Sequence, residues 1–130
     1  MKDFILYPEA LELKELGFEE PCFAYFNRDT KSLCWHSNSV EPYNHNDIDR
    51  YGDFSAPTYS QAFRWFREKY NLDLSINTVY TGYNELTTKN YSAVVDDCGS
   101  FTNVGFYKTY EEAELACLKK LIEIVKERRN

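Results

Sequence analysis

The chain has few of the residues on which catalysis and metal binding usually depend. Its 130 residues include two histidines, His36 and His45, four cysteines, five glycines and one methionine. No cysteine pair has CxxC spacing, and no glycine-rich phosphate loop, HExxH, GxSxG or EF-hand pattern occurs. General acid–base chemistry therefore has few candidates, and we predict no cofactor, no metal site and no assigned catalytic residue.

Positive charge and long apolar runs are also scarce. The chain has 15 Lys and Arg against 21 Asp and Glu, a net charge of −6. This balance argues against nucleic-acid or anionic-membrane partners, which need cations to neutralise phosphates. No stretch approaches the roughly 18 apolar residues of a membrane span. The N-terminal MKDFILYPEALEL has an early acid and no small-residue cleavage site, so we expect no signal peptide and a cytoplasmic location.

The cysteines are predicted to be free thiols that behave as small hydrophobes. Cys117 lies on the apolar side of the expected C-terminal helix, and Cys22 and Cys34 lie in strand-like runs. A disulfide framework and a zinc site at Cys34, His36 and His45 are the alternatives. The disulfide framework lacks the support of an export signal, and the zinc site lacks a recognised ligand spacing.

Aromatic residues, in contrast, are abundant. They make up 17% of the chain, with 11 Tyr, 9 Phe and 2 Trp. A core of this size does not need so many rings, so we expect several tyrosines at the surface, where their apolar face and hydroxyl suit contact with a partner.

A helix at residues 109–128 has the clearest start signal. Thr109 and Glu112 form a capping box, acids occupy the first turn and bases the last. Its apolar side chains span roughly half the circumference, more than the ≳100° stripe of a usual surface helix. This arc must be covered either by a sheet together with a second helix or the N-terminal segment, or by another chain. We therefore leave monomer and weak homodimer open.

Two further helices and several strands complete the prediction. A helix is expected at 8–16, ended by Gly17 in a Schellman motif with Phe18, and another at 57–70, started by a Thr58–Gln61 capping box. Strand-like runs lie at 22–26, 31–37, 71–82, 91–97 and 101–107, and residues 81–90 are expected to form a turn. We predict one α+β domain, residues 1–130, of order α-β-β-α-β-β(-β)-α. An antiparallel sheet of 4–5 strands would carry the helices mainly on one face.

The second half has the element order of the double-stranded-RNA-binding domain. That domain binds phosphates through lysines at the start of its last helix, whereas Lys108-Thr109-Tyr110-Glu111-Glu112 has one lysine and two acids. We therefore expect its topology at most, without its activity.

Residues 38–56 have no periodicity and are rich in Asn, Asp, Ser, Pro and Gly. Loops of this length are uncommon inside compact domains and are often functional. With the helix start that follows, the segment gives our predicted partner-binding residues: Tyr43, Tyr51, Phe54 and Tyr59. The alternative is an ordered cover over one edge of the core.

Asp96-Asp97-Cys98-Gly99-Ser100 is the most enzyme-like string. A small hydrolase or metal-dependent enzyme could use Asp96 or Asp97 with His36 or His45, although adjacent strand residues point to opposite faces. A third hypothesis is an acidic mimic of nucleic acid, based on two acid-rich surfaces. These comprise Glu9, Glu12, Glu15, Glu19 and Glu20, and Glu111, Glu112 and Glu114.

Three strings resemble a group of short uncharacterised proteins of Bacteroides-type gut bacteria, their phages and mobile elements. They are LKELGFEEPCFAYF, APTYSQAFRWFREKYNL and FYKTYEEAELACLKKLIEIV. The resemblance implies a phage or mobile-element origin and no specific activity. We expect a small non-enzymatic interaction module that binds a protein partner through residues 40–59.

Overall fold

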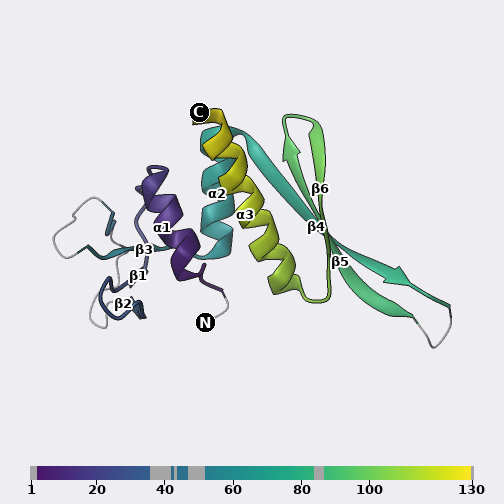
Figure 1. Ribbon diagram of the computed structural model, residues 1–130, viewed down its shortest axis with the longest axis horizontal. Coiled ribbons are helices and arrows are strands. Elements are labelled where there is room, and N and C mark those ends of the chain that lie inside the picture. Colours follow the sequence, from purple (N-terminus) through teal and green to yellow (C-terminus); the bar gives the residue numbers. More distant parts are fainter. Residues whose placement is uncertain (1–2, 36–41, 43, 47–51, 84–86, 130) are drawn as a thin grey trace. The chain divides into compact units, whose positions relative to one another are not determined.

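The computed structural model describes residues 3–35, 42, 44–46, 52–83 and 87–129. It contains three helices and six strands in these ranges, which confirms the α+β class (Figure 1). The chain divides into two compact units, Met1–Ala62 and Phe63–Asn130, and the boundary lies within helix α2 (Tyr59–Tyr70). The expectation of one domain stays a prediction, and each unit is described by itself.

The first unit combines one helix with a small sheet. Helix α1 (Tyr7–Glu15) precedes strands β1 (Ala24–Phe26), β2 (Leu33–Trp35) and β3 (Phe54–Ala56), which form an antiparallel sheet of order β2-β1-β3. The β1–β2 hairpin was predicted. Strand β3 was not, because all three of its residues are buried and the run has neither length nor alternation.

Helix α1 ends as predicted. Gly17 adopts φ +94°, and the Phe18 N–H donates to the Leu13 carbonyl at 2.9 Å, the long bond of a Schellman motif. Phe18 and Leu13 are both fully buried. The stop signal therefore fixes the chain direction after α1 and adds an aromatic ring to the core of this unit.

The second unit is a three-stranded antiparallel sheet with a long helix. Strands β4 (Leu72–Thr81), β5 (Thr88–Asp97) and β6 (Ser100–Tyr107) follow the order β4-β5-β6, and α3 (Tyr110–Arg129) follows β6. Strand β4 lies within its predicted bounds, whereas β5 begins three residues before the predicted strand, inside the segment 81–90 that was expected to form a turn. They pair over ten consecutive residues without a bulge.

Helix α3 packs on one face of this sheet. Ala93, Ala113 and Cys117 form a buried cluster. Six partly buried side chains surround it: Phe63, Leu74, Ile76, Tyr91, Val104 and Tyr107. Leu118, Leu121, Ile122 and Val125 of α3 are also buried, so the wide apolar arc is not an exposed docking surface.

The prediction of one sheet with 4–5 strands was wrong in detail, because the described strands form two separate sheets of three. Strand β1 has β2 on one side and β3 on the other, which leaves it no edge for a further strand. Among the helices of the described ranges, none is long and apolar enough to cross a membrane.

Candidate functional site

The sheet of the second unit has an outer face, which we define as the face opposite α3. Side chains alternate between the faces of a strand, and Leu74, Ala93 and Val95 lie on the α3 side. On β5, Asp96 and Ser92 alternate with Val95 and Ala93 and therefore lie on the outer face. Their register partners on β6 are Phe101 and Phe106, which lie on the same face. These rings are 71% and 61% exposed. The outer face thus carries two large aromatic side chains on one strand.

Two residues five positions apart on a regular strand would point to opposite faces. A β-bulge resolves this, because Val94 pairs with Asn103 whereas Ala93 pairs with Gly105, leaving Val104 as the extra residue. Gly105 has φ +151°, in the region that favours glycine. A Cβ there would lie 3.0 Å from the Tyr107 hydroxyl oxygen. The bulge and its glycine therefore bring both rings to one face.

The rest of the outer face is mostly uncharged and polar. Its members, assigned by alternation from the register, are Asp73, Ser75, Asn77, Val79, Thr81, Thr88, Asn90, Ser92, Val94, Asp96 and Asn103. None of these is Lys or Arg, and the two carboxylates both lie at the Phe101 end, where Asp73 and Asp96 are register partners. The face is suited to a partner without strong negative charge.

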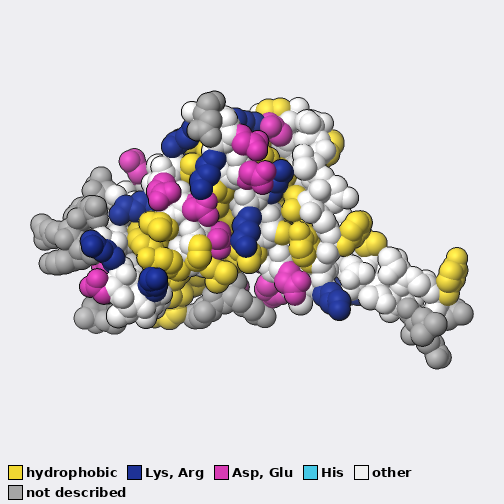
Figure 2. Space-filling view, in the orientation of Figure 1, with side chains coloured by type: hydrophobic (Ala, Val, Ile, Leu, Met, Phe, Trp, Pro, Cys, Tyr) yellow, Lys and Arg dark blue, Asp and Glu magenta, His cyan; other side chains and the backbone are white. Residues whose placement is uncertain are grey.

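The far ends of β4 and β5 form what we call the arm, residues 79–81 paired with 88–90. Strand β6 begins its pairing with β5 only at Tyr91, so the arm has two strands and extends past β6 in the ribbon of Figure 1. Tyr80 and Tyr83 are 66% and 87% exposed. The surface of the arm is mainly white in Figure 2, the colour of uncharged polar side chains and of the backbone. These positions confirm the expectation of tyrosines at the surface.

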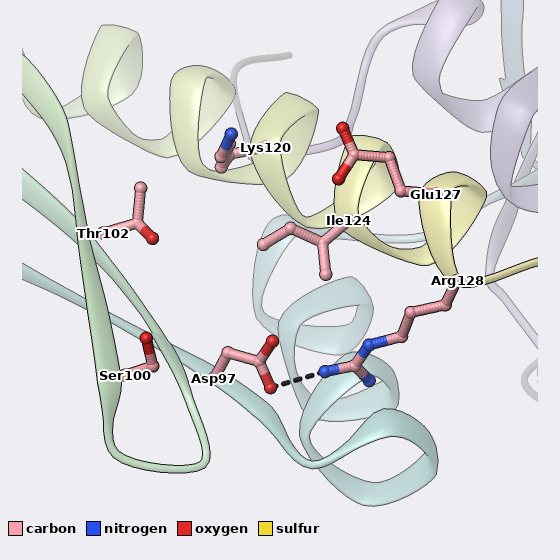
Figure 3. Close-up of a pocket in the computed structure, with 7 residues that line it drawn as sticks. All are labelled: Asp97, Ser100, Thr102, Lys120, Ile124, Glu127 and Arg128. Atoms are coloured by element: carbon pink, nitrogen blue, oxygen red, sulfur yellow. Dashed lines mark hydrogen bonds and ion pairs between the residues drawn. The ribbon is translucent and has the colours of Figure 1, made fainter.

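A hollow of about 360 Å³ lies between the β5–β6 hairpin and the C-terminal half of α3 (Figure 3). Its lining residues are Asp97, Ser100, Thr102, Lys120, Ile124, Glu127 and Arg128. Arg128 forms an ion pair with Asp97 and also donates to the Tyr70 carbonyl at 3.2 Å. Lys120 pairs with Glu123 at 3.3 Å. The cations therefore have acidic partners of the same unit, and we assign the hollow a structural role.

The two acids of the enzyme-like string have separate local roles. Asp97 binds Arg128, whereas the Asp96 carboxylate accepts the Gly99 N–H at 2.7 Å. Cys98 and Gly99, with φ of +52° and +93°, form the two-residue turn between β5 and β6. The string therefore closes a hairpin, and this structural role accounts for its residues without a catalytic function.

The histidines and the remaining cysteines lie elsewhere. His45 belongs to the first unit, where its ring stacks on the Tyr25 ring with centroids 4.4 Å apart and its backbone N–H donates to Ser55 Oγ. His36 is outside the described residues. All four cysteines are free, as predicted, although Cys98 is exposed and Cys34 half-buried. Burial raises the pKa of the Cys22 thiol to about 12 and that of Cys117 to about 11. Within the ranges described, no cluster of three or more His, Cys, Asp or Glu could hold a metal ion.

The predicted partner-binding residues do not form an exposed group in the described part of the chain. Phe54 is 2% exposed and lies against Tyr7 and Phe26, and Tyr59 is 6% exposed. Both side chains are core residues, which corrects their assignment to direct partner contact. Tyr43 and Tyr51 lie outside the described residues.

Part of the 38–56 segment is anchored to β3. The Asn46 side chain donates to the Phe18 carbonyl at 2.8 Å and accepts the Ser55 N–H at 2.9 Å. Asn46 therefore ties its segment to the end of α1 and to the sheet, which agrees with the alternative of an ordered cover. One of the predicted acidic surfaces is also smaller than expected, because Glu9 is buried.

Sequence reasoning missed Phe101 and Phe106. The run SFTNVGFY was identified only as a short strand, and a regular strand would have placed one ring inside. The signal was Gly105, since an isolated glycine in a strand often marks a bulge.

Comparisons with known proteins add no family to this picture. No protein-family model, curated protein or solved structure matches the chain.

Proposed function

We propose that the chain is a small, non-enzymatic interaction module that binds a protein partner through the outer face of the β4–β5–β6 sheet. The observation that carries the proposal is the exposure of Phe101 and Phe106 on the same face of one strand. Single exposed aromatics are common, but a bulge brings these two rings to one face, where they flank Asn103 and its register partner Val94. Aromatic side chains also dominate the binding energy of protein interfaces.

The chemistry of the outer face favours protein over nucleic acid. Phosphate binding needs Lys or Arg, and the face has neither, while Asp96 lies beside Phe101 and Asp73 lies on the far side of Asp96. Ser, Thr and Asn side chains around the rings can donate and accept hydrogen bonds at an interface rim. The four free thiols support a reducing compartment, so we place the protein in the cytoplasm. The phage or mobile-element origin rests on the sequence resemblance alone.

The acidic-mimic alternative keeps one observation in its favour. Residues 1–62 hold 11 Asp and Glu against five Lys and Arg, whereas residues 63–130 hold ten of each, so the net charge of −6 belongs to the first unit. A basic partner would bind that unit, and a partner of the outer face would bind the second. The two functions therefore predict different sites.

The test is affinity capture from the native host with matched variants. The double variant Phe101→Ser/Phe106→Ser removes both rings, and Phe23→Ser removes a phenyl ring of similar exposure, 59%, from the first unit. We expect the double variant to lose at least tenfold of the captured partner and Phe23→Ser to retain it. Equal recovery with both variants, each folded by circular dichroism, would reject the outer face as the binding site.

A further inference from the structure

Strand β4 is an edge strand without the usual protection against pairing. In the described part of the chain it pairs only with β5, so every second residue directs its backbone N–H and C=O away from the sheet. Natural edges are protected by Lys, Pro, bulges or short length. Strand β4 has ten residues, no bulge against β5, and neither Lys nor Pro. Its only charged side chain is Asp73, whose carboxylate accepts the Leu74 N–H at 2.8 Å and lies 3.8 Å from the Arg67 guanidinium, so the backbone beyond Leu74 is the part of the edge left open.

From this edge we infer that a second copy of the chain pairs antiparallel along β4, with the two-fold axis at Asn77. An unpaired backbone edge is complementary to another extended backbone, and a symmetric interface requires a surface that complements itself. Pairing about Asn77 aligns residues 73–81 of each copy. Odd-numbered residues then meet odd-numbered ones, so each face of the sheet continues unchanged across the interface.

The charges and side chains of this register are compatible with a dimer. Asp73, the one charge, lies opposite Thr81 of the other copy, so no like charges meet. On the α3 side, the exposed Tyr80 of one copy lies opposite the half-buried Leu74 of the other, next to the cluster that α3 covers. An exposed ring thus gains an apolar neighbour in each copy.

The register also accounts for the arm. A two-stranded ribbon is marginally stable in water by itself, and the arm extends past the end of β6. In the dimer, the arm of each copy lies against the base of β4 in the other. The two sheets join into one of six strands, and the outer faces stay on the same side.

The inference goes beyond the proposed function and does not depend on it, because Phe101 and Phe106 lie on β6 at the opposite edge. It does add a consequence. The two β6 strands would be about 24 Å apart at a strand spacing of about 4.8 Å. A dimer would therefore present two aromatic surfaces on one face, and a partner with two sites would bind with increased avidity.

Sedimentation equilibrium of the full chain tests the dimer. We expect a concentration-dependent mass that rises from 15.4 kDa toward twice that value. Asn77→Lys places two ammonium groups opposite each other on the two-fold axis and should weaken the dimer at least tenfold. Asn103→Lys, a matched change on the other edge strand, and Phe101→Ser/Phe106→Ser should leave it unchanged. A monomer at all concentrations up to about 0.5 mM, or loss of the dimer in Asn103→Lys but not in Asn77→Lys, would overturn the inference.

Cross-linking tests the register without relying on a destabilising change. In a Cys98→Ser background, which removes the exposed thiol, oxidised Asn77→Cys should form a disulfide-linked dimer. Ser75→Cys should form at least fivefold less, because its register partner is residue 79 of the other copy. Equal yields from the two variants, or no yield above the Cys98→Ser parent, would reject the pairing about Asn77.

Discussion

At the scale of single residues, Gly105 decides which way β6 faces. Its φ of +151° is unfavourable for other residues, and an added Cβ would displace the Tyr107 ring, whose hydroxyl donates to the Val104 carbonyl. We predict that Gly105→Ala lowers the free energy of unfolding by about 1–3 kcal/mol. Urea denaturation measures this change.

Gly99 provides the matched control for that prediction. It also has a positive φ, +93°, but an added Cβ would meet nothing within 4 Å. Gly99→Ala should therefore show only the backbone strain, about 1–2 kcal/mol. If Gly99→Ala were the more damaging of the two, the close approach to Tyr107 would not be the cause of the requirement for glycine in β6.

The buried thiols predict how stability depends on pH. In the unfolded chain a thiol ionises near its ordinary pKa of about 9, whereas burial holds the pKa of Cys22 near 12 and that of Cys117 near 11. Between pH 9 and 11 the folded state therefore binds more protons, and stability falls as pH rises, by roughly 1 kcal/mol per pH unit for each thiol. The stabilisation is fully present below pH 9.

Thermal unfolding between pH 8 and 10.5 measures this dependence. Cys22→Ala should unfold at a lower temperature at pH 8 and have a shallower decline with pH. Cys98→Ser, which replaces an exposed thiol with a hydroxyl that can also bond to Asn71, should follow the wild-type curve. Parallel curves for wild type and Cys22→Ala would show that burial of Cys22 is not the source of the decline.

At the scale of elements, the helix starts depend on threonine caps. The Thr109 hydroxyl accepts the Glu112 N–H at 3.1 Å, and the Thr58 hydroxyl accepts the Gln61 N–H at 3.2 Å. Replacing an N-cap threonine with alanine costs about 1 kcal/mol. We predict this loss for Thr109→Ala, measured by urea denaturation, and retention of most of the stability in Thr109→Ser. Equal losses in the two variants would exclude the hydroxyl as the stabilising group.

The same elements show what sequence can and cannot predict here. Helix ends were predicted within two residues, because Thr58, Thr109 and Gly17 act on atoms a few positions away. Strand β3 and the division of the strands into two sheets were missed, because the pairing of Phe26 with Phe54 depends on residues 28 positions apart. The outer face was missed for a local reason, since a single bulge reverses the facing of every later residue in β6. The candidate site thus depended on register, which periodicity does not specify.

At the scale of the whole molecule, charge is divided unevenly along the chain. The first unit holds the entire excess of 11 acids over five bases, and the second is balanced. Glu19 follows the end of α1 and is exposed, so it is a suitable position at which to remove one of these charges. Repulsion among these carboxylates opposes compaction of the first unit.

Salt should therefore stabilise the protein. At 0.01 M ionic strength the Debye length is about 30 Å and the carboxylates repel one another, whereas at 1 M it is about 3 Å and they do not. We predict that the unfolding temperature rises with NaCl, and that Glu19→Gln raises it by about 1–2 °C at low salt and reduces the salt dependence. Glu68→Gln, an exposed change in the balanced second unit, is the control and should do neither. If Glu68→Gln reduced the salt dependence equally, the repulsion would belong to the chain as a whole and not to its first unit.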